Sequence, residues 1–415
     1  MSNQPKKIII TDCFAHNSGD VGILMAMVAE IRREMPAVEI AIESTHPEVL
    51  RQFLEFDGLT IVPRIFDVRD YDWQGVWWRR LFVALRGSYD SVTFLLWAGL
   101  TRAGLNADFI VRRARRDQAR LLRNVTAFIS VGGGFLSSYY NYYFRLYVYL
   151  IGFLLGKQVL LLAQSVGPFE TRTSRFLVPK FLERCAIITI REPNSFSYVR
   201  HLGLKTRCVQ TADAAFLLAK KKAAWLDQLL ATDRQTVAVA LKYYSDPVKQ
   251  QAFVLAIEAA IKYLQQQAYD ILLVSQVKET DRQAAALIAA VGGRVRAVPF
   301  GVNPRELKEL YAHCRFVVSG IMHPTIFAAD SAVPFVAISY EPKLLGLLEL
   351  LQYDERFMLD GQQLCTPSFP AQLIAAIKLL ELERTAVANQ LTERLPAVRA
   401  LAHDNFKLLA EVIHT

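Results

Sequence analysis

Short apolar runs alternate with helical periodicity along almost the whole chain. The runs predict strands at residues 7–13, 38–43, 125–131, 159–164, 186–190 and 207–211 in the first half, and at 236–241, 270–275, 294–299, 316–318 and 333–339 in the second. Strands that alternate with helices form parallel sheets covered on both faces. Two such series predict an α/β chain with two Rossmann-like, doubly wound domains facing a cleft.

The length of the chain also favours two domains, because 415 residues are too many for one ordinary hydrophobic core. We expect the first domain over residues 1–220 and the second over residues 233–415, with a Lys-rich connector at 219–232 between them. The amphipathic residues 370–414 predict two closing helices. Facing domains of this kind bring the carboxyl ends of their strands to a shared cleft, where we expect the site.

The first residues enter a strand without the apolar run of a secretory signal, and the five cysteines are scattered. This pattern predicts a cytoplasmic protein with reduced thiols. Since no CxxC pair or other spacing typical of metal ligands occurs, we expect neither a metal nor a cofactor. The longest apolar stretch, at residues 146–155, is too short to cross a bilayer.

Positive charge is concentrated in a predicted helical insertion at about residues 70–123. Between residues 79 and 123, arginines stand at positions 79, 80, 86, 102, 112, 113, 115, 116, 120 and 123, against Asp90, Asp108 and Asp117, with Trp73, Trp77, Trp78 and Trp97 in or beside the same segment. Arginine mixed with tryptophan and leucine suits a protein that rests on an anionic membrane surface. An ordinary helical excursion with a solvated basic face is the alternative. Nucleic acid is not an expected partner, because no helix-turn-helix, RNP or zinc-finger spacing accompanies the charge.

In the second half, His323 and Lys343 each follow a predicted strand. They therefore belong to the same edge of the sheet, where open parallel sheets bind ligands. Pro324 suits the first position of the helix that follows His323. A titratable imidazole and a cation beside a helix amino terminus predict a site for an anionic substrate. A hydrogen-bonded core histidine is the alternative interpretation of His323.

In the first half, small and polar residues follow the strands. Asn17, Gly19 and Asp20 come after the first strand, where Asp20 serves either as a base for a substrate hydroxyl or as the N-cap of the next helix. Gly133 and Gly134 either let a ligand approach the backbone or let a strand and helix pack tightly.

Two further turns of the first half carry Ser165 and Arg191. Arg191 leaves a strand at the same edge and suits a carboxylate or phosphate bound through two parallel hydrogen bonds. A salt-bridged structural arginine is the alternative.

Taken in order, these turns resemble those of a known family. The matching motifs are Asn17-x-Gly19-Asp20, Gly132-Gly133-Gly134, Ser165-x-Gly167-Pro168, Arg191-Glu192-x-x-Ser195, Asp213, His323, Val333-Pro334 and Tyr340-x-x-Lys343. Their order and spacing resemble the polysaccharide pyruvyl transferases over most of the chain. The resemblance implies a fold similar to GT-B glycosyltransferases. It also implies transfer of a pyruvyl group from phosphoenolpyruvate to a sugar of a cell-surface polysaccharide, or of its lipid-linked precursor, giving a cyclic ketal and phosphate.

The chain departs from the family at one position, because Ile321-Met322-His323 stands where the family usually has Arg-x-His. An arginine expected to hold the donor is therefore missing, and one charge-assisted hydrogen bond contributes about 1.5–3 kcal/mol. Either Lys343, Lys242 or Arg191 compensates, or the donor differs, or the activity is lost.

The implied reaction assigns roles to the remaining residues. It needs a proton on the methylene carbon of the donor and attack by a sugar hydroxyl, so His323 is the expected general acid and Asp20 the expected base. Arg191 and Lys343 are expected to bind the phosphate and carboxylate. The resemblance adds Asn17, Gly19, Gly133, Gly134, Ser165 and Tyr340 as substrate contacts.

Two other functions stay open. The first is a GT-B glycosyltransferase that uses a nucleotide sugar, because the fold alone does not separate donors. The second is a non-catalytic binding or scaffold protein. Ile321 motivates this alternative, because it replaces an arginine expected to hold the donor.

Overall fold

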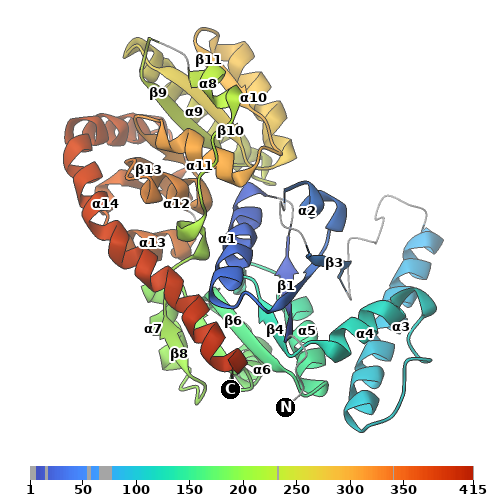
Figure 1. The fold of residues 1–415 in the computed structure, drawn as a ribbon. Helices are drawn as coiled ribbons and strands as arrows, with labels where there is room; N and C mark the ends of the chain where they lie inside the picture. Colours follow the sequence, from blue (N-terminus) through green and yellow to red (C-terminus); the bar gives the residue numbers. More distant parts are fainter. Residues whose placement is uncertain are drawn as a thin grey trace.

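The computed structural model describes residues 6–14, 17–53, 58–64, 77–230, 233–339 and 341–414, and of residues 77–86 it describes the helix but not the side chains. Within these ranges the chain forms two parallel β-sheets, each covered by helices (Figure 1). The predicted α/β fold with two Rossmann-like domains is confirmed. Each predicted strand is present, and its ends lie within two residues of the predicted ends.

The first sheet has eight strands among the described residues, in the order β3-β2-β1-β4-β6-β7-β8, with β5 paired to β6. Its strands are β1 Lys7–Cys13, β2 Glu39–Ser44, β3 Thr60–Pro63, β4 Ala127–Ser130, β5 Gly133–Leu136, β6 Gln158–Val166, β7 Ile187–Ile190 and β8 Cys208–Gln210. The strand order reverses between β1 and β4. Such a switch point opens a crevice at the carboxyl ends of the strands.

The second sheet has six strands in the described part of the chain, in the order β11-β10-β9-β12-β13-β14. Its strands are β9 Thr236–Leu241, β10 Asp270–Ser275, β11 Val295–Val298, β12 Val317–Ser319, β13 Phe335–Ser339 and β14 Met358–Asp360. Numbered within the domain, this order is 3-2-1-4-5-6, the order of the Rossmann fold. The switch point here lies between β9 and β12.

Helices follow nearly every strand. In the first domain they are α1 Ser18–Glu34, α2 Pro47–Phe53, α3 Trp77–Arg102, α4 Arg116–Asn124, α5 Tyr143–Leu154, α6 Arg172–Leu182 and α7 Pro193–His201. Between β8 and β9 lie the short helix η3 Ala214–Leu217 and, in the connector, α8 Ala224–Leu230. In the second domain they are α9 Pro247–Gln266, α10 Lys278–Val291, α11 Pro304–Ala312, α12 Met322–Asp330, α13 Pro342–Leu351 and α14 Phe369–His414.

The central strands are buried on both faces, which is why their sequences are apolar runs rather than alternating patterns. All six residues of β9 and all six of β10 are buried. One hydrophobic core joins α1 and its face of the first sheet to the second domain, and the other face of the first sheet packs against α3–α6. The apolar core therefore continues across the junction between the domains.

The last helix was predicted as two helices, and this prediction is wrong. Helix α14 is continuous over 46 residues with Pro396 inside it, and it runs from the second domain back to the first (Figure 1). An internal proline removes one backbone hydrogen bond and usually breaks a helix. Packing at both ends keeps this one continuous. Near its end, the buried Asn405 accepts a hydrogen bond from Thr211 Oγ1 at 2.9 Å and donates one to Ala212 O at 2.9 Å.

The basic insertion forms α3 and α4, which project from the first domain (Figure 1). Trp97 is fully buried there and donates from Nε1 to Asp108 at 3.0 Å, so this tryptophan is a core residue rather than a surface anchor. Trp73 and the side chains of Trp77 and Trp78 lie outside the described residues. None of the helices described has the length and apolar character needed to span a membrane.

Candidate functional site

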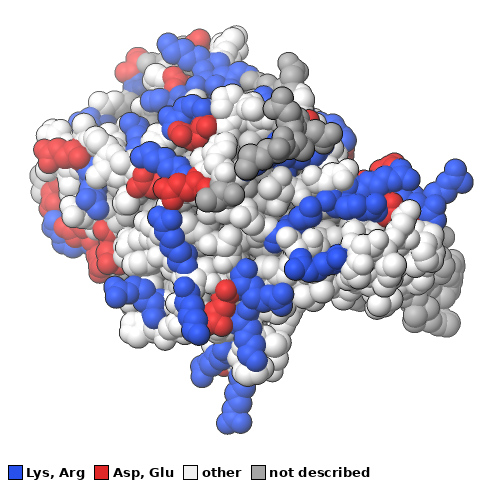
Figure 2. Space-filling view, turned by 60° about the horizontal axis from the view of Figure 1, so that its bottom comes forward, with Lys and Arg blue, Asp and Glu red and all other residues white. Residues whose placement is uncertain are grey.

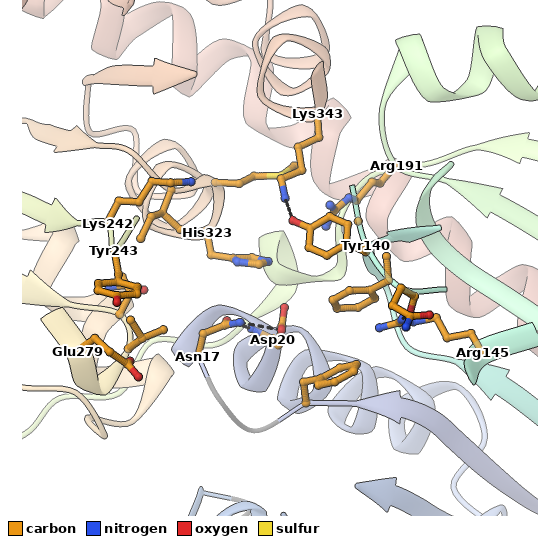
Figure 3. A pocket seen from close by; sticks show the side chains of 18 of the residues that line it. Asn17, Asp20, Tyr140, Arg145, Arg191, Lys242, Tyr243, Glu279, His323 and Lys343 are labelled. Atoms are coloured by element: carbon orange, nitrogen blue, oxygen red, sulfur yellow. Dashed lines mark hydrogen bonds between the residues drawn. The ribbon is translucent and has the colours of Figure 1, made fainter. Parts of the chain in front are cut away.

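A cavity of about 670 Å³ lies between the two domains, at the carboxyl ends of both sheets (Figure 3). Residues that follow β1, β3 and β7 line one wall, and residues that follow β9, β10, β12 and β13 line the other. The cavity brings together six predicted site residues: Asn17, Asp20, Gly134, Arg191, His323 and Lys343. The predicted Tyr340 lies outside the described residues.

His323 is the second residue of α12, and its ring rests on the amino-terminal turn of α1. Pro324 is therefore the third residue of the helix rather than the first, because Met322 begins it. A Cβ atom on Gly19 would lie 2.0 Å from Nδ1 of His323, so only glycine admits the ring at this position. Nε2 of His323 is buried and has no hydrogen-bond partner among the described residues.

The electrostatic surroundings of His323 favour the neutral ring. Burial lowers the pKa of His323, and Arg191 and Lys343 lower it further, while Asp20 and Asp213 act in the opposite direction. An anion bound beside the ring would stabilise the imidazolium and raise this pKa. The protonation of His323 is therefore sensitive to what occupies the cavity.

Asn17, rather than Asp20, caps helix α1. Oδ1 of Asn17 accepts a hydrogen bond from the backbone N of Asp20 at 2.8 Å, and Nδ2 of Asn17 donates to Oδ2 of Asp20 at 2.7 Å. The interpretation of Asp20 as the N-cap is wrong, since α1 begins two residues earlier, at Ser18. Asp20 is held in the first turn as a half-buried carboxylate beside the cavity.

Arg191 is fully buried and paired with two carboxylates. Nε donates to Ser165 Oγ and to Glu192 Oε1, both at 2.8 Å, and Nη1 donates to Asp213 Oδ2 at 2.5 Å. Burial alone would lower the pKa of Arg191, but these two carboxylates raise it above its ordinary value. The arginine is thus salt-bridged and also lines the cavity. Its Nη2 is outside these bonds and would lie 3.2 Å from a Cβ on Gly134, so contact with an anion would use one nitrogen rather than a fork.

The predicted glycine turn is partly a strand, because Gly133 begins β5. A Cβ on Gly133 would lie 2.1 Å from the ring of Phe135, and a Cβ on Gly134 would lie 3.3 Å from Cδ of Lys343. Gly133 therefore makes room for an aromatic ring, while Gly134 lines the cavity itself. Ser165 lies outside this cavity and lines a smaller one of about 160 Å³ that shares Gly134 and Lys343 with it.

Lys343 stands at the second position of α13 and links the two domains. Nζ lies 2.7 Å from Oε2 of Glu341 and donates to the hydroxyl of Tyr140 at 3.0 Å (Figure 3). Burial tends to lower the pKa of Lys343, but Tyr140 and Glu341 raise it overall. Glu341 and Tyr140 were not predicted, because their contact joins residues 201 positions apart in the sequence.

Lys242 follows β9 and is buried in the second wall of the cavity. Burial lowers the pKa of Lys242 to about 6, with Glu341 raising it and Lys343 lowering it. Cβ of Lys242 would lie 3.3 Å from a Cβ on Gly320, the residue before Ile321. This lysine therefore adjoins the position where the family usually has arginine.

A second basic group lies at the first-domain end of the cavity, where Figure 3 shows Arg145 on the far side of Tyr140 from His323. Arg64 and Arg145 line the cavity together with Phe14 and Phe135. Sequence reasoning missed this group. A signal was present, because Arg145 is the one charged residue of the otherwise apolar helix α5, YFRLYVYLIGFL.

Solved structures similar to this chain share its architecture. A putative UDP-N-acetylglucosamine 2-epimerase from Listeria monocytogenes has a TM-score of 0.59 at 10% identity, covering 97% of this chain and 94% of that one. UDP-GlcNAc 2-epimerase from Neisseria meningitidis has a TM-score of 0.59 at 10% sequence identity, and the match covers 98% of each chain. A UDP-glucosyltransferase from Polygonum tinctorium has a TM-score of 0.56 at 13% sequence identity, and the match covers 100% of each chain. At these identities the likeness shows the fold alone, which is the GT-B-like arrangement of two Rossmann domains.

Sequence comparison identifies the family. The chain is 25% identical over 257 residues to the amylovoran biosynthesis protein AmsJ of Erwinia amylovora, a match that covers 56% of this chain and 61% of that protein. The chain thus spans less than two thirds of the length of this relative. A family model described as polysaccharide pyruvyl transferase matches residues 90–342, more than half of the chain and all of the motifs between Gly132 and His323. The chain belongs to the polysaccharide pyruvyl transferase family.

Proposed function

We propose that the chain transfers a pyruvyl group from phosphoenolpyruvate to a sugar of a cell-surface polysaccharide, or of its lipid-linked precursor, forming a cyclic ketal. The proposal is carried by one observation: a histidine whose buried nitrogen has no partner among the described residues shares a cavity with cations from both domains. The donor carries a phosphate and a carboxylate, and both need cationic partners. Family membership supports the same reaction.

The donor binds, in this proposal, against Lys343, Lys242 and the outward nitrogen of Arg191. Lys242 is the best replacement for the arginine missing at Ile321, because its side chain packs against Gly320 and is buried at the cavity wall. A buried lysine with a pKa of about 6 is mostly neutral at pH 7 and becomes charged when an anion binds. Binding of the donor would therefore protonate Lys242, and the charged lysine would stabilise the bound anion.

The proposed chemistry has two bond-forming stages. His323 gives a proton to the methylene carbon of the donor, a first sugar hydroxyl adds to the adjacent carbon, and Asp20 accepts the proton of that hydroxyl. A second hydroxyl of the same sugar then displaces the phosphate, whose bond to carbon breaks, and the proton of that hydroxyl leaves with the phosphate. The product is the ketal with one free carboxylate, plus inorganic phosphate.

The test is incubation with phosphoenolpyruvate and a panel of lipid-linked and aryl glycosides, with phosphate release and product mass as readouts. We expect phosphate to appear only with an acceptor that has two suitably placed hydroxyls, together with one pyruvyl ketal per product. Preferential binding of a nucleoside diphosphate and transfer from a nucleotide sugar would instead support the glycosyltransferase. Binding of donor and glycoside without turnover of either would support a scaffold protein.

We also propose that the arm formed by α3 and α4 rests on an anionic membrane surface, on the cytoplasmic side. Tyr89, Val92, Leu96 and Leu100 recur along α3 at helical spacing and are exposed by 52%, 55%, 56% and 36%, and Phe109 after the helix is exposed by 73%. Basic side chains gather along the protruding arm beside broad uncharged surface (Figure 2). Part of the charge is used internally, since Arg112 pairs with Asp90 and Arg123 with Asp108. Arg102 and Arg113 are exposed and support lipid headgroup contact, while the exposed Arg120 pairs with Asp117 at 3.0 Å.

Sedimentation with liposomes tests the membrane proposal. We expect binding to anionic vesicles at low salt, release by added salt, and loss of binding in the double variant Val92→Glu, Leu96→Glu. Leu382→Glu is the matched control, because this leucine is 84% exposed on α14, outside the arm. Equal binding to neutral vesicles would remove the electrostatic part of the proposal. Failure to bind either kind of vesicle would remove all of it.

A further inference from the structure

The first-domain end of the cavity contains two buried arginines that the donor site does not use. Arg64 follows β3 and Arg145 lies in the first turn of α5, and their exposed fractions are 5% and 3%. Both line the cavity. Burying a guanidinium is costly unless carboxylates and hydrogen bonds compensate it, so the partners of these two residues matter.

Among the described residues, both arginines pair with the carboxylate of Asp12, and Arg145 also donates from Nη1 to Asn141 O at 3.3 Å. Asp12 Oδ1 lies 3.5 Å from Nη2 of Arg64 and 3.7 Å from Nε of Arg145, longer than the 2.7–2.9 Å usual for such pairs. The same carboxylate already accepts hydrogen bonds from Ser130 Oγ at 2.8 Å and Tyr149 OH at 3.1 Å. The other buried carboxylate of this region is Glu43, on the adjacent strand β2.

In each of the two arginines, Arg64 and Arg145, the buried Nε has no hydrogen-bond partner among the described residues. Burial lowers the pKa of Arg145, and Asp12 opposes that shift only in part. A guanidinium that lines a cavity with an unused donor is suited to an anionic ligand.

Aromatic rings hold the two guanidinium groups in place. Cζ of Arg145 lies 4.3 Å from the ring centroid of Phe135 and 5.0 Å from that of Phe14, and Cζ of Arg64 lies 5.0 Å from the Phe14 ring. The two rings are 5.5 Å apart. Gly133 allows this arrangement, since a Cβ there would occupy the space of the Phe135 ring. The result is a fixed apolar wall beside fixed positive charge.

We propose that this end of the cavity is the acceptor subsite and that it selects an acceptor saccharide bearing a negative charge, either a uronic acid carboxylate or a sugar phosphate. This inference rests on the proposed function. The rings of Phe14 and Phe135 pack against the sugar, and Arg64 and Arg145 bind the anionic group. His323 and Asp20 line another part of the same cavity, where in this proposal the hydroxyls of the acceptor meet the donor (Figure 3).

The test measures acceptor binding directly, without turnover. Isothermal titration of the protein with aryl galacturonide, galactose 1-phosphate and neutral aryl galactoside compares the two anionic groups with an uncharged ligand. We expect at least one of the anionic ligands to bind about ten-fold or more tightly than the galactoside in the wild-type protein, and added salt to reduce that preference. The better of the two anionic ligands identifies the source of the charge.

Variants then locate the preference. Arg145→Gln and Arg64→Gln should each bring the ratio of anionic to neutral affinity close to one, and Arg145→Lys should retain part of it. Arg113→Gln, an exposed arginine outside the cavity, is the matched control. Thermal unfolding shows which variants are folded, and the wild-type comparison of ligands remains decisive if a variant is not.

The outcomes separate this inference from the proposed function. Equal affinity for anionic and neutral saccharides in the wild-type protein would overturn the subsite, even if pyruvyl transfer to a neutral sugar occurs. A charge preference that survives in both glutamine variants would overturn it as well. Charge-selective binding at Arg64 and Arg145 without any use of phosphoenolpyruvate would keep the subsite and reject the proposed reaction.

Discussion

The two walls of the cavity hold their positive charge in different ways. On the first-domain wall the charges are arginines, and Arg191 is fixed by Glu192 and Asp213. On the second-domain wall they are Lys343, whose pKa Tyr140 and Glu341 raise, and His323 and Lys242, whose pKa values burial lowers, that of Lys242 to about 6. An arginine stays charged at every accessible pH, whereas His323 and Lys242 lose their charge more easily because their pKa values are lowered. The first wall therefore carries permanent charge, and the second combines the charge of Lys343 with two groups whose charge depends on the ligand.

The titratable groups of the second wall change how an anionic donor binds. With an empty cavity, the lowered pKa values of His323 and Lys242 favour their neutral forms, which limits the cost of burying them beside Lys343 and the arginines. An anionic donor favours the charged forms of these groups, because its negative charge raises the pKa of every cationic group beside it. We therefore expect donor binding to take up protons mainly on the second wall.

The largest expected effect is that of removing the titratable ring on the second wall. His323→Gln should lower kcat for pyruvyl transfer by about 10²–10⁴-fold, the range typical of a lost general acid. Affinity for phosphoenolpyruvate, measured by titration, should change far less. His313→Gln is the control, because His313 is an exposed histidine at the end of α11. An unchanged kcat for His323→Gln would reject its role as the acid.

The next largest effect concerns the contact between the walls. In Gly19→Ala the new methyl group would lie 2.0 Å from Nδ1 of His323, so the ring must move or the domains must separate. We expect kcat to fall by about ten-fold or more, since a displacement of about 1 Å is enough to misalign reacting groups. Gly99→Ala is the matched control within a helix, because no atom lies within 4 Å of a Cβ there. Equal activity of both variants would show that the ring position is not critical.

The pH dependence of donor binding tests the charge on the second wall directly. Below pH 6 Lys242 is already protonated and attracts the donor fully, whereas above pH 6 binding must first protonate it. Lys242→Met should therefore weaken phosphoenolpyruvate binding by about ten-fold near pH 6, as expected for one charge-assisted hydrogen bond, and by less at pH 8. Titration in buffers of different ionisation enthalpy should show fewer protons taken up by the variant. A pH-independent effect would contradict the prediction.

The smallest effect should come from adding a permanent charge to the second wall. Ile321→Arg restores the Arg-x-His spacing of the family and should tighten phosphoenolpyruvate binding a few-fold, with no dependence on pH between 6 and 8. If affinity is unchanged or weaker while Lys343→Ala abolishes it, the existing lysines already occupy the space. If neither substitution changes affinity, the donor is not phosphoenolpyruvate.

Much of the fold could be predicted from the sequence because its central strands are buried on both faces and leave continuous apolar runs. Three strands escaped prediction: β3, β5 and β14. The first and last lie at sheet edges and the middle one is off the main path, and each has only three or four residues, too few to stand out as an apolar run. The continuity of α14 also escaped, because a proline inside a helix predicts a break unless tertiary packing compensates it.

The site was predicted only where it follows the ends of strands. His323, Arg191 and Lys343 could be placed at one edge because parallel topology fixes that edge. The pairing of Arg191 with Glu192 and Asp213, the proximity of Glu341 to Lys343, and the position of Arg64 beside Phe14 depend on how distant segments pack. Local pattern carries no information about such contacts.

The long helix α14 limits how the two domains can move. The chain passes between the domains twice, once through the connector after η3 and once along α14, whose Arg399 contacts Asp330 of the second domain while Asn405 is bonded to the first. A body attached at two points can rotate easily only about the line that joins them. We therefore expect opening of the cavity to be a rotation about an axis along this side of the molecule. Such a rotation would separate residues that meet across the cavity, among them His323 of the second domain and Gly19 of the first.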